Sequence, residues 1–255
     1  MNRIFISVNY GTTDIIRNWH RSIGDLFKHD KVIIIDNFYS LEERENIKKL
    51  SKELKFVLIE SENIGYGNGL NKAFKYLQEE NLNLDNYIVF AGNLDILYKN
   101  LNISFVNGKN VYVPFALEIK RNRNPFLTIF QKHFLKLHLF SIKSNSLFVF
   151  KLVIVIIKLA GFIPSKIWAL HGSLFIFNAS ILNHGNIFNE NSFLYSEELE
   201  FASFVEHIAN SKFIDCDVVY EHIGHVSTSS VIASLDDFYK VWKPSFNNWL
   251  LRWKD

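Results

Sequence analysis

Four short apolar runs in the N-terminal part of the chain constrain its fold more than any other feature. They are rich in β-branched and aromatic residues, as buried strands are, and they cover residues 4–8, 32–35, 56–59 and 87–90. Segments with a different periodicity separate them. Strands that alternate with helices predict βαβ units, and such units build a mostly parallel sheet.

Helical spacing fills the gaps between these runs. Residues 12–27 carry apolar side chains four positions apart, which predicts one amphipathic helix over the whole range. Ser40 followed by Glu43 predicts a capping box at the start of the next helix. A third helix, around residues 73–77, is predicted just after a glycine-rich turn. The apolar residues of the first helix are Ile15, Trp19, Ile23 and Phe27.

Polar residues follow the second, third and fourth strands directly. They include Asp36, the segment 63–69, and the pair Asn93 and Asp95. Ligands of parallel sheets bind at the carboxyl ends of the strands, so these residues mark a candidate site. A carboxylate such as Asp95 is well placed there to hold a divalent cation that bridges phosphates. The alternative is a helix cap or turn residue.

The glycine-rich segment, residues 63–71, reads Asn-Ile-Gly-Tyr-Gly-Asn-Gly-Leu-Asn. It partly resembles a dinucleotide-binding fingerprint, but it follows the third strand and not the first. One interpretation is a flexible turn. The other is a backbone that approaches a nucleotide or phosphate closely, which glycine permits.

A cluster of carboxylates lies at residues 193–200, which read Phe-Leu-Tyr-Ser-Glu-Glu-Leu-Glu. Neighbouring like charges repel, so a solvated helix N-terminus is the simplest interpretation. The alternative is a catalytic cluster. In that case Glu197 and Glu200 should raise the pKa of Glu198, which suits a general base.

Composition excludes some functions. The net charge of +2 gives no indication of nucleic-acid binding. The single cysteine, Cys216, excludes an internal disulfide and a cysteine-based zinc site, and it fits a reducing compartment. No signal peptide is recognisable at the N-terminus, so a cytoplasmic location is expected.

Residues 119–189 contain no Asp or Glu, and residues 119–168 are predicted to form a basic, apolar helical insertion. At about 100° per residue, five lysines of this insertion would share a sector of roughly 100°, unless residues 144–146 break the helix. The segment 147–162 is too short and too charged for a membrane span. It either lies in a membrane interface, on the inner face of the cell membrane, or packs on the core and flanks the candidate site. The lysines are Lys132, Lys136, Lys143, Lys151 and Lys158.

Two further strands are predicted, at residues 172–177 and 213–220. The tail, residues 234–255, carries aromatic residues among Lys and Arg, and Pro244 is predicted to break it into two helical pieces. This tail either covers the core or forms a second interfacial contact or a dimer surface.

In order and spacing, these motifs resemble those of family 2 glycosyltransferases of the GT-A fold, of the rhamnosyltransferase-like kind. The resemblance extends over about residues 3 to 230. Leu94 stands where that family has proline, and Glu198 and Glu200 stand where it has aspartate. The matching segments are Val8-Asn9-Tyr10-Gly11, Ile35-Asp36-Asn37-Phe38-Tyr39-Ser40, residues 63–71, Asn93-Leu94-Asp95, residues 193–200, and the degenerate His222-Ile223-Gly224-His225-Val226-Ser227.

The resemblance implies an α/β, Rossmann-like GT-A domain over residues 1–233, with a mixed, mostly parallel sheet and flanking helices. It implies inverting transfer of a sugar from a nucleotide diphosphate-sugar to an acceptor hydroxyl. The acceptor would be a lipid-linked saccharide of a bacterial surface polysaccharide, O-antigen or capsule. The alternative is a catalytically inactive GT-A scaffold that binds nucleotide or a partner at the membrane surface. The sugar, the nucleotide base and the oligomeric state are not specified by the sequence.

The resemblance also assigns roles to residues. Glu198 takes the place of the catalytic base, supported on the acceptor side by Glu197, Glu200 and His171. Asp95, with His222, would hold Mg²⁺ or Mn²⁺. The donor-binding residues would be Asn9, Asp36, Asn63, Gly65, Gly67, Asn71 and Asn93.

Overall fold

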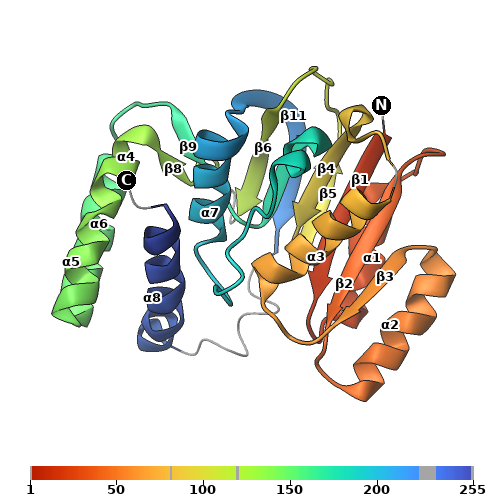
Figure 1. Ribbon diagram of the computed structural model, residues 1–255, viewed down its shortest axis with the longest axis horizontal. Coiled ribbons are helices and arrows are strands. Elements are labelled where there is room, and N and C mark those ends of the chain that lie inside the picture. Colours follow the sequence, from red (N-terminus) through yellow and green to blue (C-terminus); the bar gives the residue numbers. More distant parts are fainter. Residues whose placement is uncertain (1, 81, 119–120, 224–233, 254–255) are drawn as a thin grey trace.

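The four apolar runs form neighbouring strands in the computed structural model, which describes residues 2–80, 82–118, 121–223 and 234–253. The strands are β1 (Asn2–Asn9), β2 (Lys31–Asn37), β3 (Val57–Ser61), β4 (Tyr87–Gly92), β5 (Ile96–Asn100), β6 (Asn110–Glu118), β7 (Arg121–Asn122), β8 (Leu127–Thr128), β9 (Ile167–Ala169), β10 (Leu174–Asn178) and β11 (Lys212–His222). Among these residues, nine strands form one sheet, ordered β3-β2-β1-β4-β10-β6-β11-β5 with β7 paired to β6 (Figure 1). β8 and β9 form a separate ladder.

One edge of this sheet collects the polar strand ends. β1, β2, β3 and β4 are parallel, with Asn9 opposite Asp36 and Ser7 opposite Gly92. β10 is antiparallel to β4 and starts opposite its end, since Leu174 pairs with Gly92. β11 is parallel to β6 and ends there too. The predicted strands at 172–177 and 213–220 are thus confirmed as β10 and β11.

Helices cover both faces of the sheet. On one face, α3 and α7 pack over a core that includes Phe74 and Phe201. On the other face, α1 and α2 pack over a core that includes Trp19 and Ile47. The helices are η1 (Thr13–Ile15), α1 (Ile16–Ile23), α2 (Leu41–Leu54), α3 (Tyr66–Glu79), η2 (Leu84–Asn86), α4 (Ile129–Leu135), α5 (Leu137–Ser144), α6 (Leu147–Ala160), η3 (Ala179–His184), α7 (Glu197–Phe204), η4 (Val205–Ala209) and α8 (Leu235–Arg252).

The first predicted helix is shorter than expected. It ends at Ile23 because Gly24 adopts a φ of 71°, a left-handed conformation that stops a helix. Phe27 therefore leaves the buried face and is 66% exposed. The start of α2 is as predicted, since the Ser40 side chain accepts a hydrogen bond from the Glu43 backbone.

The basic insertion and the tail pack together. α4, α5, α6 and α8 lie at one end of the molecule, away from α2, in Figure 1. Phe150 of α6 and Trp242 and Phe246 of α8 share a core with residues of α7. The predicted break at Pro244 is wrong, because α8 runs unbroken through it. Burial of the flanking aromatic rings compensates for the one missing backbone hydrogen bond. The domain limits at residues 119, 168 and 233 stay predictions.

The helix breaks at residues 144–146, the condition under which the five lysines were not expected to share one sector. Asn145 takes a left-handed conformation after α5, and Ser146 caps α6. A single lysine face is therefore wrong: the five lysines are distributed over α4–α6, and Lys132 is paired with Glu206. No helix in the described part of the chain combines the length and hydrophobicity that crossing a membrane requires.

Candidate functional site

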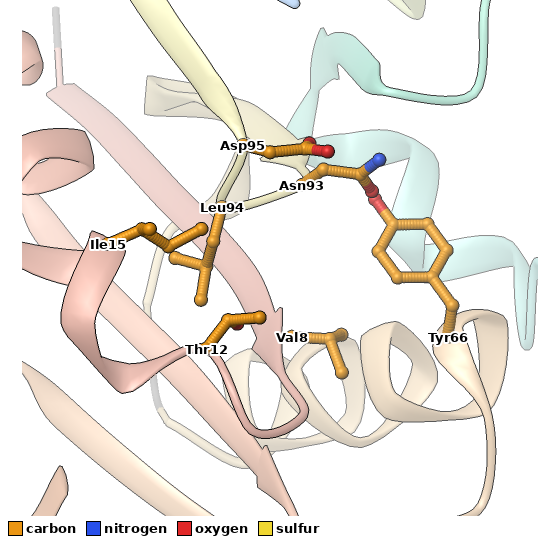
Figure 2. Close-up of a pocket in the computed structure, with 7 residues that line it drawn as sticks. All are labelled: Val8, Thr12, Ile15, Tyr66, Asn93, Leu94 and Asp95. Atoms are coloured by element: carbon orange, nitrogen blue, oxygen red, sulfur yellow. The ribbon is translucent and has the colours of Figure 1, made fainter. Parts of the chain in front are cut away.

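The polar edge of the sheet opens into a cavity of about 200 Å³. A smaller hollow of about 40 Å³ adjoins it and shares Tyr66, Asn93 and Asp95 with it (Figure 2). The cavity is built by the turn after β4, the segment before β10, the start of α7 and the end of β11. Its lining residues are Tyr66, Asn93, Asp95, His171, Gly172, Ser173, Leu194, Tyr195, Glu197, Glu198 and His222.

The turn that carries Asp95 is held in place by its neighbours. The Asn93 amide donates to the Ser173 carbonyl at 2.9 Å, and the Ile223 amide donates to the Asp95 carbonyl at 2.9 Å. Leu94 is 4% exposed and packs into the core beneath the turn. Buried leucine thus anchors the turn at the position where the resembled family has proline.

Asp95 and His222 form an ion pair inside the cavity. His222 Nε2 lies 3.4 Å from Asp95 Oδ1, and His222 Nδ1 lies 3.3 Å from Glu118 Oε1. Burial disfavours the imidazolium, but the two carboxylates outweigh it, so the pKa of His222 is raised. The geometry of the first contact is not that of a hydrogen bond, and Asp95 Oδ1 has no donor among the described residues.

The donor set suits a divalent cation that is shared with a phosphate ligand. No three His, Cys, Asp or Glu side chains of the described residues meet in a way that would enclose a metal ion. Asp95 and His222 nevertheless offer a carboxylate oxygen without a donor and an imidazole nitrogen at one point of the cavity wall. Mg²⁺ and Mn²⁺ sites of this kind complete their coordination with phosphate oxygens and water.

Glu197 and Glu198 face the same cavity from the first turn of α7. The preceding residues, Tyr195 and Ser196, have φ values of 67° and 73°, a strained conformation for residues other than glycine. This tight turn brings both carboxylates onto the cavity wall. Gly172 makes room for one of them, since a Cβ atom there would lie 2.5 Å from Glu198 Oε1.

The two carboxylates are partly exposed to the cavity but otherwise enclosed by protein. Burial, together with the charge of Glu198, raises the pKa of Glu197 to about 8. Burial also raises the pKa of Glu198. The predicted direction for Glu198 is therefore confirmed, while its main cause is desolvation and not the neighbouring acids.

Glu200 lies outside the cavity. It is 1% exposed, and its Oε2 accepts hydrogen bonds from Arg252 at 3.0 Å and from the Trp253 indole at 2.8 Å. Position 200 points from α7 toward the end of α8, and the supporting role of Glu200 at the acceptor stays a prediction. Glu200 fastens the tail to α7.

His171 lines the cavity, as the prediction of a site residue requires. Its ring lies 5.4 Å from that of His222, and its Nδ1 is 2.7 Å from Ser173 Oγ. Ser173 Oγ lies 2.9 Å from the Tyr220 hydroxyl. Burial and the nearby His222 lower the pKa of His171 to about 4, so the ring is neutral at pH 7.

The glycine-rich segment contacts the chain itself. Gly65 has a φ of 87°, and a Cβ atom there would collide with the Phe193 carbonyl. A Cβ atom on Gly67 would lie 3.0 Å from the Phe188 side chain. The Asn71 amide group donates to the Phe188 carbonyl at 2.9 Å and accepts from its amide at 3.2 Å. This segment therefore packs against residues 188–193, and the role of Gly65, Gly67 and Asn71 in donor binding stays a prediction.

Asn9 and Asp36 lie at the ends of β1 and β2 and are hydrogen-bonded within the protein. Asn9 Nδ2 donates to Asp36 Oδ1 at 3.1 Å, and Arg44 Nε donates to Asp36 Oδ2 at 2.9 Å. Asp36 is 2% exposed, so both of its carboxylate oxygens are engaged with protein. Asn9 in turn accepts from the Thr12 amide, and Thr12 lines the smaller hollow. Asn63 is exposed in the loop between β3 and α3.

The cavity unites six of the predicted site residues. Asn93, Asp95, His171, Glu197, Glu198 and His222 all line it. Sequence reasoning missed Tyr66 and Ser173, although Tyr66 lies between two glycines of a recognised motif. Figure 2 shows the Tyr66 hydroxyl directed toward the Asn93 side chain. Residues 224–227 of the last motif lie outside the described residues.

Comparisons with known proteins find similar structures. No protein-family model matches the chain, and no curated protein matches its sequence. TarS of S. aureus matches with a TM-score of 0.53 at 13% identity, covering 94% of this chain and 38% of that one. The mannosyltransferase PcManGT of Pyrobaculum calidifontis, solved with GDP-Man and Mn²⁺, matches with a TM-score of 0.50 at 14% identity, over 89% of this chain and 59% of that one.

Glucosyl-3-phosphoglycerate synthase of Mycobacterium tuberculosis, solved with Mn²⁺, UDP and phosphoglyceric acid, gives a TM-score of 0.57 at 12% identity. That match covers 99% of this chain and 78% of the synthase. The chain spans less than two thirds of the TarS and PcManGT chains. It has the α/β GT-A fold that the sequence predicts, while the rhamnosyltransferase-like subtype stays a prediction.

Proposed function

We propose that this chain is a glycosyltransferase that moves a sugar, with inversion, from a nucleotide diphosphate-sugar to an acceptor hydroxyl. One observation carries the proposal: a single cavity of about 200 Å³ places the Asp95–His222 pair and the Glu197–Glu198 pair on its walls. Sugar transfer needs two such functions, a group that stabilises the departing diphosphate and a base for the attacking hydroxyl.

The donor would lie against Asp95 and His222. These residues would hold a divalent cation, Mg²⁺ or Mn²⁺, which neutralises charge on the departing diphosphate. The resolved complexes of PcManGT with GDP-Man and Mn²⁺, and of the mycobacterial synthase with UDP and Mn²⁺, support this ligand class. Asn93, and Tyr66 above the smaller hollow, would contact the sugar or the phosphates.

Glu198 would be the base. The acceptor oxygen attacks the anomeric carbon on the face opposite the diphosphate, the bond from that carbon to the diphosphate oxygen breaks, and the hydroxyl proton passes to Glu198. Glu197, with a pKa of about 8, is mostly protonated at pH 7 and is poorly suited to take this proton. Neutral His171 would donate or accept a hydrogen bond at the acceptor.

For the acceptor we propose a lipid-linked saccharide in the synthesis of a bacterial surface polysaccharide, O-antigen or capsule, at the cytoplasmic side of the membrane. The motif resemblance supports this choice. The exposed apolar surface described in the next subsection also suits an acceptor that is carried by a lipid.

Donor screening tests the proposal. UDP-, dTDP- and GDP-sugars are added with and without Mn²⁺, and the melting temperature of the purified protein is recorded, because a true donor stabilises the folded state by mass action. Donors that stabilise are then tested for nucleoside diphosphate release. Stabilisation without turnover on any acceptor would favour the inactive scaffold. No stabilisation by any donor would contradict nucleotide-sugar binding altogether.

A further inference from the structure

The outer side of α6 presents an apolar stripe. Four residues at spacings of four, three and four, as on one helix face, are between 50% and 75% exposed. The stripe continues beyond the helix with Phe162, which is 83% exposed. The opposite side of α6 is buried through Phe150, Val153 and Ile157, so the helix is apolar on both sides. The stripe residues on α6 are Phe148, Leu152, Val155 and Leu159.

This stripe lies on the outer flank of the molecule. Figure 1 shows α5 and α6 at the end farthest from α2, with α8 between them and α7. Phe140 of α5, 72% exposed, adds to the apolar surface of the same helical hairpin. Contiguous exposed apolar surface on this scale marks an interaction site in soluble proteins.

Positive charge accompanies the stripe. Lys151 and Lys158 are exposed on α6 and project on one side of the stripe, about 70° and 90° from its centre. Lys143, near the end of α5, and Lys166, just before β9, are exposed as well. The sequence has no Asp or Glu from residue 119 to residue 189, so no acid of this segment offsets them. Lys132 is not part of this surface, because it is paired with Glu206.

Charge decides between two occupants. A second copy of the chain that packed stripe against stripe would bring Lys151 and Lys158 close to their counterparts, with no acid of the insertion to compensate. An anionic phospholipid surface offers acyl chains to the stripe and phosphates to the lysines. An anionic membrane surface therefore complements both the apolar stripe and the lysines beside it.

We propose that residues 148–163 form an interfacial membrane contact. The stripe enters the boundary between headgroups and acyl chains of an anionic bilayer, with α6 parallel to the surface and Lys151 and Lys158 at the phosphates. The contact differs from the predicted face at Lys132–Lys158 in its residues, since the apolar stripe carries it. It does not depend on the proposed sugar transfer, although it would bring a lipid-linked acceptor close.

Vesicle flotation tests the contact without any sugar donor. The wild-type chain is mixed with vesicles of phosphatidylcholine, with and without phosphatidylserine. We expect binding to the anionic vesicles, and weaker binding at high salt or without phosphatidylserine. Leu159→Glu should weaken binding about tenfold or more, because it removes apolar area and adds a repelled charge. The matched control is Leu41→Glu on α2, another strongly exposed leucine, which should bind as the wild type does.

Lys151→Ala and Lys158→Ala provide a second test that spares the stripe. Each should weaken binding to anionic vesicles about fivefold and leave binding to neutral vesicles unchanged. These side chains are exposed, so the variants test the proposal even if Leu159→Glu fails to fold. Absence of wild-type binding, or equal binding by Leu159→Glu and Leu41→Glu, would overturn the proposal. So would a wild-type dimer in sedimentation that Leu159→Glu converts to a monomer.

Discussion

Two walls of the cavity carry acidic side chains, and they differ in whether basic side chains are paired with these acids. On the sheet wall, Asp95 and Glu118 flank His222, and Arg123 pairs with Glu118. On the α7 wall, Glu197 and Glu198 lie side by side, and no basic side chain is paired with either among the described residues. The first wall is electrostatically compensated, while the second is not.

Backbone geometry differs in the same way. The sheet wall consists of strand ends and a turn that is anchored by two backbone hydrogen bonds. The α7 wall depends on two consecutive left-handed residues, Tyr195 and Ser196. On the sheet wall, Asp95 and His222 would hold a cation beside the diphosphate once the His222 ring has released its proton, because only the neutral imidazole can coordinate a metal. On the α7 wall, the raised pKa of Glu198 makes its carboxylate a stronger base, which suits it to take a proton from an acceptor. The comparison therefore predicts that substitutions on the two walls will affect different steps.

The largest effect is expected for Glu198→Gln. The variant keeps the size of the side chain but cannot accept the acceptor proton, so turnover should fall about 10²- to 10⁴-fold. Donor affinity should stay close to that of the wild type, because the sheet wall is untouched. Turnover assays beside calorimetry of nucleotide binding measure the two quantities separately.

Glu197→Gln is the matched control for this experiment. Because the pKa of Glu197 is about 8, the side chain is mostly neutral at pH 7, and glutamine resembles its natural state. Turnover at pH 7 should therefore change little. If Glu197→Gln is inactive while Glu198→Gln turns over normally, the base is Glu197. If both variants stay active, the carboxylates form only a solvated helix start.

Asp95→Ala probes the sheet wall and should affect binding first. It removes the carboxylate that would hold the cation, so nucleotide affinity in the presence of Mn²⁺ should fall about ten- to a hundredfold. Affinity without metal should change much less. Calorimetry with and without Mn²⁺ gives both values. An unchanged metal dependence in the variant would place the cation elsewhere.

Gly65→Ala tests the junction of the two walls. The substitution combines a φ of 87° with a collision against the Phe193 carbonyl. We expect a loss of about 1–3 kcal/mol or more in the free energy of unfolding. Gly24→Ala is the matched control, since Gly24 also has a positive φ, 71°, but open space around it.

A displaced Phe193 should shift α7 and leave Asp95 in place. Turnover of Gly65→Ala should then fall more than its nucleotide affinity. Equal losses in Gly65→Ala and Gly24→Ala, in stability and in turnover, would show that the contact with Phe193 does not position α7.

Local patterns made the strands and the sheet wall predictable. The β-branched runs that form β1 to β4 can be recognised without knowing which strands they pair with. The polar ends of parallel strands meet at one edge of the sheet, so their residues could be grouped from the sequence. Glu197 and Glu198 were recognisable because three carboxylates in four residues are unusual. Their common cavity with Asp95 and His222 could be expected only from the resemblance, since no local pattern relates residue 95 to residue 198.

Long-range partners account for the contacts that the sequence did not predict. Glu200 belongs to the same carboxylate cluster in the sequence as Glu197 and Glu198. Its side chain nevertheless points toward α8, where it accepts hydrogen bonds from Arg252 and Trp253. The glycines looked open to a ligand because nothing in the sequence indicates that Phe193 packs on Gly65. Pro244 does not end α8, since the surrounding aromatic core outweighs a local preference.

The smallest expected effect concerns stability against pH and again separates the two walls. Glu197 has a folded-state pKa of about 8 and an ordinary value near 4.5 when unfolded. Between these values the folded state keeps a proton that the unfolded state has released. The stabilising contribution is therefore complete below about pH 4.5 and is lost as the pH rises through about 8. Glutamine cannot ionise, so the melting temperature of Glu197→Gln should rise relative to that of the wild type as the pH increases from about 4.5 to about 8, and the difference should stay constant above that range. Thermal unfolding across this range measures the difference, with Gly24→Ala as a control whose curve should run parallel to that of the wild type. A constant difference between Glu197→Gln and the wild type at every pH would mean that Glu197 titrates as an ordinary exposed acid, and the α7 wall would then lose its distinction from the sheet wall.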